Sequence, residues 1–269
     1  MSSGMREMSL DGMSLAYAQA GQGAPLVLLH GFLCDARCWR HQLADLSSDF
    51  TVIAWDAPGA GGSSDPPDAF TLADWSRCLE QFLDALEIER PYLLGLSWGG
   101  VLAQEFYIRH PERVSRLVLA DTYAGWSGSF APSVVSQRLS RCEHDSHLPP
   151  DEFVARWVPE MFSAEAPPGL LAELATVFRG FHPHGFRLMA KSLADADTRG
   201  FLVRIDVPTL LLWGEQDSRS PASVAHELQR TIPRSELHFI PQAGHVSNME
   251  QPAAFNAHVR HFCRRPNER

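Results

Sequence analysis

The sequence predicts an α/β protein built on one mostly parallel β-sheet with helices on both faces. Short continuous apolar segments, such as LVLL at 26–29 and LLLW at 210–213, are typical of strands that are buried on both faces. These segments alternate with amphipathic ones at helical spacing, and such alternation favours parallel strands joined by right-handed crossovers. With 269 residues, of which 45% are hydrophobic, the chain suits one large domain with an insertion.

Eight strands are expected along the chain. The first two form an antiparallel pair around a turn at Asp11-Gly12, and the others are short apolar segments that follow helices or glycine-rich loops. In chain order the expected strands cover residues 5–10, 14–20, 26–29, 51–55, 91–95, 113–121, 208–214 and 236–240.

Five helices are expected to cover the sheet. One covers 36–47, and a second covers 72–86 with Thr71 as its N-cap and Asp74 in its first turn, close to a capping box. A third follows the fifth strand and ends near residue 110. A fourth has Ser220 as N-cap and Pro221 at its first position, and the last opens at Pro252.

Residues 122–200 interrupt this alternation. The segment has no convincing buried strand, but it contains several amphipathic stretches separated by the proline pairs 149–150 and 167–168. We interpret it as a helical cap inserted into a core made of residues 1–121 and 201–269. Most of its aromatic residues are expected to pack the cap against itself and the core, and a few to line a pocket.

Composition excludes several classes of protein. The net charge of −9, without long basic runs, argues against nucleic acid or an anionic membrane as partner. The five cysteines are scattered without a C-x-x-C pair, so neither a disulfide framework nor a metal site is indicated. The first residues lack the apolar region of a signal peptide, and no segment approaches 18 uninterrupted apolar residues. We expect a cytoplasmic protein, and a homodimer is compatible with the sequence.

The motif Gly95-Leu96-Ser97-Trp98-Gly99 has the G-x-S-x-G form of a nucleophile elbow. A serine on so tight a strand-to-helix turn is in a strained backbone conformation, and a side chain two residues away would collide with the neighbouring chain. Gly95 and Gly99 remove those collisions. The turn exposes the Ser97 hydroxyl, and the start of the following helix offers backbone donors to a developing negative charge.

A second glycine-rich turn, at 56–63, suggests a different function. A strand followed by Gly59-Ala60-Gly61 could begin a dinucleotide-binding fingerprint. However, Ser64 stands where the third glycine or alanine is expected, and Pro66-Pro67 delays the next helix to about residue 71. No helix N-terminus is then close enough to receive a pyrophosphate, so we reject this interpretation.

Four features lie at the ends of predicted strands, and together they resemble the α/β-hydrolase superfamily over essentially the whole chain. They are the elbow at Ser97, the loop His30-Gly31-Phe32, Asp217, and Gly244-His245. Serine, then acid, then histidine is the chain order of that superfamily's triad. The resemblance implies the α/β-hydrolase fold, with a mostly parallel eight-stranded sheet, helices on both faces and an inserted helical cap.

The resemblance implies a role for each of these residues. Ser97 would be the nucleophile and His245 the base that takes its proton, while Asp217 orients the imidazole. The backbone N–H groups of Phe32 and Trp98 would form the oxyanion hole. No metal or organic cofactor is implied. Asp121 also follows a strand and is an alternative acid. The residues expected near the substrate are His30, Trp126, Trp157 and Val246. In this family, a histidine at the position of His30 usually braces the oxyanion loop.

The segments 117–122 and 244–255 look most like the branch of 3-oxoadipate enol-lactonases, esterases and cofactor-free perhydrolases. Trp98 is bulkier than the residue common there, and Ala60 replaces a frequent histidine. We therefore expect a small-molecule ester or lactone as substrate. Alternatives are a carbon–carbon bond hydrolase of meta-cleavage-type diketones, an enol-lactonase proper, a perhydrolase, or a non-catalytic ligand receptor. Against the first of these, Val246 stands where that branch often has tryptophan.

The cap decides between two kinds of substrate pocket. An enol-lactonase would need a cation near Ser97 for the carboxylate of its substrate, because burying that charge without a partner is costly. A hydrolase of neutral esters would have an apolar pocket walled by Phe32, Trp98 and cap aromatics, and the aromatic content of the cap favours this second form. The cap residues that could supply a cation are Arg138, Arg141, Arg156, Arg179, Arg187 and Lys191.

Overall fold

The computed structural model describes residues 4–266, and its centre is an eight-stranded sheet. The strand order is β1-β2-β4-β3-β5-β6-β7-β8; β1 and β2 are antiparallel to their neighbours, and β3 to β8 are parallel. The predicted fold class is confirmed. The strands are β1 (Met5–Leu10), β2 (Met13–Ala20), β3 (Ala24–Leu29), β4 (Phe50–Trp55), β5 (Tyr92–Leu96), β6 (Arg116–Ala120), β7 (Thr209–Gly214) and β8 (Ser235–Ile240).

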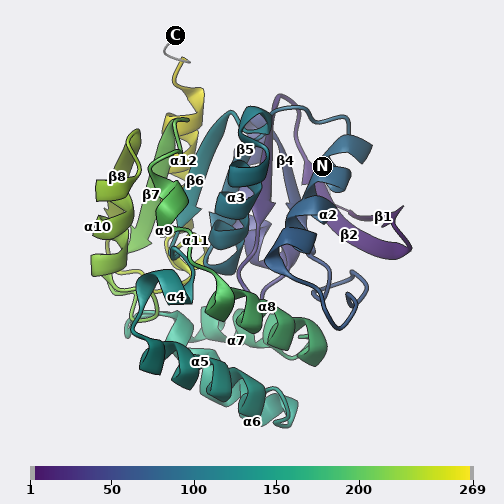
Figure 1. Cartoon of the computed structure of the whole chain (residues 1–269), viewed down its shortest axis with the longest axis vertical. Helices are drawn as coiled ribbons and strands as arrows, with labels where there is room; N and C mark the ends of the chain where they lie inside the picture. Colours follow the sequence, from purple (N-terminus) through teal and green to yellow (C-terminus); the bar gives the residue numbers. More distant parts are fainter. Residues whose placement is uncertain (1–3, 267–269) are drawn as a thin grey trace.

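Helices cover both faces of this sheet. In Figure 1, α2 and α3 lie in front of the sheet and α12 lies behind it. The first expected helix is divided into α1 and a 3₁₀ turn at each end, η1 and η2. The helices of the core are η1 (Ala36–Trp39), α1 (Arg40–Asp45), η2 (Leu46–Ser48), α2 (Leu72–Ala85), α3 (Trp98–Arg109), η3 (Pro111–Arg113), α10 (Ala222–Thr231), α11 (Ser247–Glu250) and α12 (Pro252–Arg264).

The helix start expected at Ser220 is wrong. α10 begins at Ala222, with Pro221 in the N-cap position and no side-chain cap. The Ser220 hydroxyl instead donates to the carbonyl of Thr122 at 2.5 Å, which ties the loop after β7 to the loop after β6. By contrast, Thr71 does cap α2, where the Asp74 carboxylate accepts a hydrogen bond from the Thr71 N–H at 2.9 Å.

Every described element between β6 and β7 is helical. Four of these helices, α5 to α8, begin with proline, which fits the first turn because its missing N–H would be unpaired there. Figure 1 shows α4 to α8 gathered below the sheet. The elements are α4 (Trp126–Ser129), α5 (Pro132–Asp145), α6 (Pro150–Trp157), η4 (Pro159–Met161), α7 (Pro168–Phe178), α8 (Pro183–Asp195) and α9 (Arg199–Leu202).

The parallel arrangement brings the loops that follow β3 to β8 to one edge of the sheet. These loops contain, in chain order, Phe32, Asp56, Ser97, Asp121, Asp217 and His245. Open parallel sheets gather ligands at this edge. Among the described residues, no helix has both the length and the apolar character needed to cross a lipid bilayer.

The elbow glycines provide a test of the fold. A Cβ on Gly99 would lie 2.2 Å from the carbonyl oxygen of Leu29, which belongs to a buried backbone that cannot move aside. We expect Gly99→Ala to lower the free energy of unfolding by about 3 kcal/mol or more, as overpacking of a rigid core does. Urea unfolding followed by circular dichroism measures the change.

Gly169 in the first turn of α7 supplies the control, because a Cβ there would meet no atom within 4 Å. Gly169→Ala is expected to leave stability within about 1 kcal/mol of the parent, since alanine is the better helix former. Equal unfolding midpoints for both variants would contradict the close approach at Gly99.

Candidate active site

A continuous chain of hydrogen bonds joins three side chains from separate loops. The Ser97 Oγ lies 2.9 Å from His245 Nε2, and His245 Nδ1 lies 2.8 Å from Asp217 Oδ2. All three side chains are shielded from solvent, since the residues are only 3%, 3% and 6% exposed. The structure thus brings together the three residues that the sequence proposes as a triad.

The backbone at Ser97 has the strained conformation that its motif predicts. Its φ is +52° and its ψ is −115°, in a region that side chains rarely adopt. The surrounding backbone holds it there: the Ser97 N–H donates to the carbonyl of Ala120 at 2.9 Å, and the Thr122 hydroxyl donates to the Ser97 carbonyl at 2.5 Å. The serine hydroxyl is therefore held at the edge of the sheet, next to the imidazole.

Asp217 is held by its own loop in a position to accept from the imidazole. One of its carboxylate oxygens accepts hydrogen bonds from the backbone N–H groups of Arg219, at 2.8 Å, and Ser220, at 3.0 Å. The other oxygen faces His245 Nδ1. Because a carboxylate only accepts, it keeps the proton of the neutral ring on Nδ1 and leaves Nε2 free to take a proton from Ser97.

Asp121, the alternative acid, is occupied elsewhere. Its two oxygens accept from the Gly214 N–H at 2.7 Å and from the Ser247 hydroxyl at 2.6 Å, and it makes no hydrogen bond to the His245 ring. Burial raises the pKa of Asp121 well above its usual range, and the nearby charge of Asp217 raises it further. Asp121 therefore connects the loops that bear Asp217 and His245.

Phe32 and Trp98 supply two unoccupied donors beside the serine. Trp98 is the first residue of α3, so its N–H has no acceptor within the helix, and within residues 4–266 neither its N–H nor that of Phe32 bonds to the protein. Gly31, which precedes Phe32, packs on the serine, since a Cβ there would lie 3.4 Å from Ser97 Cβ. These donors are where the sequence places an oxyanion hole.

His30 supports the loop after β3 through both of its ring nitrogens. Its Nδ1 donates to the carbonyl of Gly31 at 2.7 Å, while its Nε2 accepts from the N–H of Ala57 at 3.0 Å. Complete burial lowers the pKa of His30, which keeps the ring neutral as this pattern requires. The neighbouring Asp56 binds the N–H groups of Ala36 and Gly62, and burial raises its pKa to about 6.

Aromatic side chains from the cap surround the ring of Phe32. Trp126 and Trp157 meet it edge to face, with centroids at 6.2 and 5.9 Å, and Phe186 stacks on it at 5.2 Å. The two tryptophans are among the residues that the sequence predicts near the substrate, whereas Phe186 is not. Val246 is buried next to His245, and its N–H donates to the carbonyl of Met161 at 3.2 Å.

Three arginines lie against these rings, and the guanidinium of Arg141 is 4.6 Å from the Trp157 ring. The guanidinium of Arg219 is 5.8 Å from the Phe32 ring and 5.0 Å from the Trp157 ring. Arg138 lies 4.1 Å from Phe130 and 5.9 Å from Tyr123, and the Tyr123 ring is 6.2 Å from that of His245. Arg219 Nη1 forms an ion pair with Glu160 at 3.1 Å, and Arg138 Nη2 donates to the carbonyl of Arg219 at 2.9 Å. Among the described residues, Arg219 Nε and Arg138 Nη1 are buried without a hydrogen-bond partner.

Arg138 is among the cations that the sequence proposes near the substrate, but Arg219 is not. The signal for Arg219 in the sequence is its position two residues after Asp217, in the loop that supplies the proposed acid. Arg141 forms a two-fold ion pair with Glu160, the acid that also pairs with Arg219, and Lys191 pairs with Asp195 on the surface. Arg156 pairs with Asp145, Arg179 with Asp151, and Arg187 donates to Ser146.

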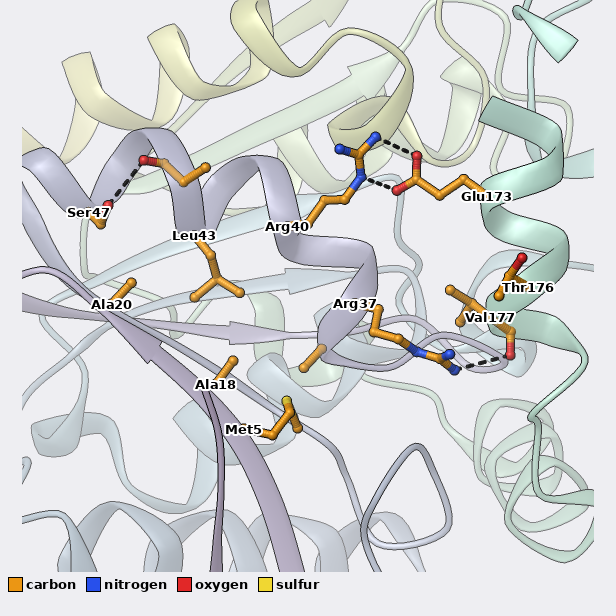
Figure 2. A pocket seen from close by; sticks show the side chains of 12 residues that line it. Met5, Ala18, Ala20, Arg37, Arg40, Leu43, Ser47, Glu173, Thr176 and Val177 are labelled. Carbon is orange, nitrogen blue, oxygen red and sulfur yellow. Dashed lines mark hydrogen bonds and ion pairs between the residues drawn. The ribbon is translucent and has the colours of Figure 1, made fainter. Parts of the chain in front are cut away.

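A separate groove of about 850 Å³ lies where the cap helix α7 meets α1 and the sheet (Figure 2). Its apolar floor includes Ala18 and Leu43, and none of the triad residues lines it. Arg40 on α1 and Glu173 on α7 point toward each other across the groove and form a two-fold ion pair (Figure 2). Within residues 4–266, no group of three or more histidine, cysteine or acidic side chains is placed to hold a metal ion.

Several known proteins are similar to this chain in sequence or in structure. The chain is 28% identical over 259 residues to 3-oxoadipate enol-lactonase 2 of Acinetobacter baylyi, covering 95% of each chain. It is 31% identical to 2-hydroxymuconate semialdehyde hydrolase of a Pseudomonas species, covering 96% of this chain and 93% of the other. A thermophilic esterase from Thermogutta terrifontis superposes with a TM-score of 0.88 at 28% identity, over 97% of this chain and 98% of that one.

The family match covers most of the sheet and the whole of the cap. Residues 26–258 match the Alpha/beta hydrolase family, and this range contains all the loops that bear the triad. The match, the serine-acid-histidine order and the eight-stranded sheet agree with one another. The chain therefore belongs to the Alpha/beta hydrolase family.

Proposed function

We propose that the protein is a serine hydrolase that cleaves a small ester or lactone through an acyl-enzyme intermediate. The observation that supports this most directly is the hydrogen-bonded chain from Ser97 through His245 to Asp217. A serine hydroxyl is a weak nucleophile, and a neutral imidazole aligned by a carboxylate is the group that activates it. The relatives named as an enol-lactonase and an esterase are consistent with this chemistry.

In the first half of the reaction, Ser97 Oγ attacks the carbonyl carbon and its proton moves to His245 Nε2. The imidazolium that forms is stabilised by Asp217. The negative charge on the former carbonyl oxygen is received by the N–H groups of Phe32 and Trp98, each contributing about 3 kcal/mol to transition-state stabilisation. His245 then returns its proton to the leaving alkoxide, and the acyl group stays on Ser97.

In the second half, water attacks the acyl-enzyme. His245 takes a proton from the water as the new carbon–oxygen bond forms, and then protonates Ser97 Oγ as the acid leaves. A lactone differs only in that its alcohol remains attached to the acyl chain. The proposed reaction uses only the substrate, water and groups of this chain. The five cysteines are free and buried, which is consistent with our proposal of a reducing, cytoplasmic location.

The arginines support a substrate that carries an anion. A pocket of aromatic rings alone would suit a neutral ester, as the aromatic content of the cap suggests. Although Arg219 Nη1 pairs with Glu160, Arg219 Nε and Arg138 Nη1 are buried N–H groups without partners among the described residues, and such groups are costly unless a ligand satisfies them. We therefore propose that the ester or lactone carries a carboxylate that these two arginines receive.

A second candidate reaction is cleavage of a carbon–carbon bond in a vinylogous diketone. It is supported by the relative named 2-hydroxymuconate semialdehyde hydrolase, at 31% identity. The same serine, histidine and acid would serve, so the triad does not separate the two reactions. A substrate screen with esters, lactones and meta-cleavage products separates them, and a ligand receptor would turn over none of these compounds.

Replacing the nucleophile tests the proposal directly. Ser97→Ala removes the attacking oxygen, so hydrolysis of whichever substrate is found should fall by about 10⁴-fold or more, while the protein stays folded. Initial rates with a chromogenic short-chain ester and with lactones measure this, and circular dichroism checks the fold. Near-normal turnover by the variant would rule out the mechanism.

A matched pair of variants tests which acid serves His245. Asp217→Asn keeps the shape but loses the charge and permits the wrong tautomer of the ring, so kcat should fall by roughly 10³- to 10⁴-fold. Asp121→Asn removes an acid that does not touch the ring, and kcat should change by less than about tenfold. If the Asp121 variant is the more severely impaired in kcat, the assignment of the acid is wrong.

Arg219→Gln tests the anionic substrate. Glutamine keeps a polar side chain of moderate length but removes the cation, so kcat/KM for a carboxylate-bearing lactone should fall by roughly 10- to 100-fold. The value for a neutral lactone of the same ring size should change by less than about threefold, because that substrate never used the charge. Parallel losses for both lactones would contradict the role of Arg219.

A further inference from the structure

One helix of the cap, α8, contacts the side chains of both residues that we propose as oxyanion donors. Its residue Ser192 bonds to Trp98, and its residue Phe186 stacks on Phe32. Phe32 lies in the loop after β3 and Trp98 is the first residue of α3, after β5, so the same cap helix contacts both residues of the proposed oxyanion hole.

The link to Trp98 is a buried hydrogen bond. The indole Nε1–H of Trp98 donates to Ser192 Oγ at 2.9 Å, and that hydroxyl donates onward to the carbonyl of Met189 at 2.7 Å. The Trp98 ring also packs edge to face on Trp75 of α2, with centroids at 5.2 Å. Since the Trp98 side chain is completely buried between these partners, its position is coupled to that of α8.

The link to Phe32 is a stacked aromatic pair. The rings of Phe32 and Phe186 lie 5.2 Å apart with an angle of 20° between their planes. The Phe32 ring also meets Trp126 and Trp157 of the cap edge to face, and Arg219 of the core lies 5.8 Å from it. All three aromatic neighbours of the Phe32 ring named here therefore belong to the cap, although Phe32 itself belongs to the core.

The first turn of α8 is itself fastened to the core. Gly185 packs backbone to backbone on Gly59, where a Cβ on Gly59 would lie 2.7 Å from Gly185 Cα. His182, just before the helix, lies 2.7 Å from Asp65 and 3.1 Å from the carbonyl of Gly61 through its two ring nitrogens. The start of α8 is therefore fixed to the core, and residues further along the helix contact the side chains of Phe32 and Trp98.

We infer that α8 is a positioning element for the oxyanion hole, and that Ser192 and Phe186 are positioning residues that set the Trp98 and Phe32 N–H groups for the transition state. The inference rests on the proposed hydrolase function. Oxyanion donors act only when they aim at the place where the charge develops, and displacement by about 1 Å is enough to cost up to 10²-fold in rate. The cap would then control kcat as well as substrate choice.

The test compares Ser192→Ala and Trp98→Phe, which remove the acceptor and the donor of the same hydrogen bond. Each should lower kcat for the best ester or lactone by roughly tenfold and leave KM within about twofold, because the transition state is affected more than the ground state. The double variant should be no worse than either single one, since both break one link. Melting curves show whether each variant is folded at the assay temperature.

A second measurement separates positioning from general loosening of the cap. Phenylboronic acid adds to a serine hydroxyl and forms a tetrahedral adduct, with the serine proton passing to His245. Its affinity should fall with Ser192→Ala by the same factor as kcat. Glu173→Gln is the matched control, because it breaks another link between cap and core, the ion pair with Arg40, without touching Phe32 or Trp98. That variant should keep kcat and boronate affinity within about twofold.

Three results would overturn the inference. These are an unchanged kcat in both Ser192→Ala and Trp98→Phe, a change in KM alone, or an equal loss of kcat in Glu173→Gln. None of these three results contradicts the proposed function, which is contradicted only if Ser97→Ala keeps the activity of the parent. A wild type that hydrolyses the substrate through Ser97, with kcat unaffected by Ser192→Ala, would leave a serine hydrolase whose oxyanion hole is independent of α8.

Discussion

The close backbone approach at the serine turn is the constraint on which the rest of the structure depends. Ser97 has a positive φ, and its turn fits only because Gly95 and Gly99 have no side chains to collide with the neighbouring backbone. Such strain persists only where the surroundings hold it, and here the parallel strands on either side do so through Ala120 and Leu29. The sheet therefore serves as the rigid support for one hydroxyl at its edge.

The same sheet explains why the other groups of the site converge. Each parallel strand ends at one edge, so residues separated by more than a hundred positions in the chain, such as Ser97 and His245, lie within a hydrogen bond of each other. Short bonds between loops then set the details. Ser220 reaches the loop of Thr122, and Asp121 joins the loops of Asp217 and His245 through Gly214 and Ser247.

The cap adds chemistry that the sheet lacks. It surrounds Phe32 with aromatic rings, and it contributes Arg138 to a region where the core contributes Arg219. Cations over aromatic rings keep part of their stabilisation when water is excluded, and together with the ion pair between Arg219 and Glu160 this lets the guanidinium groups stay buried. In our proposals, substrate specificity and the orientation of the oxyanion donors therefore both depend on how the cap packs on the core.

The sequence by itself determined the fold class, the order of the strands along the chain, and the pairing of Ser97 with His245 and one of two acids, Asp217 or Asp121. These depend on local signals, namely apolar runs, glycine spacing and the residues just after each strand, and a parallel sheet places such residues at one edge whatever the details of packing. Only the tertiary structure decided that Asp217 rather than Asp121 faces the imidazole, because both follow buried strands and the choice depends on loop hydrogen bonds. It also revealed Arg219, Phe186 and the bond between Trp98 and Ser192, since these contacts join distant segments and leave no periodic pattern in the chain.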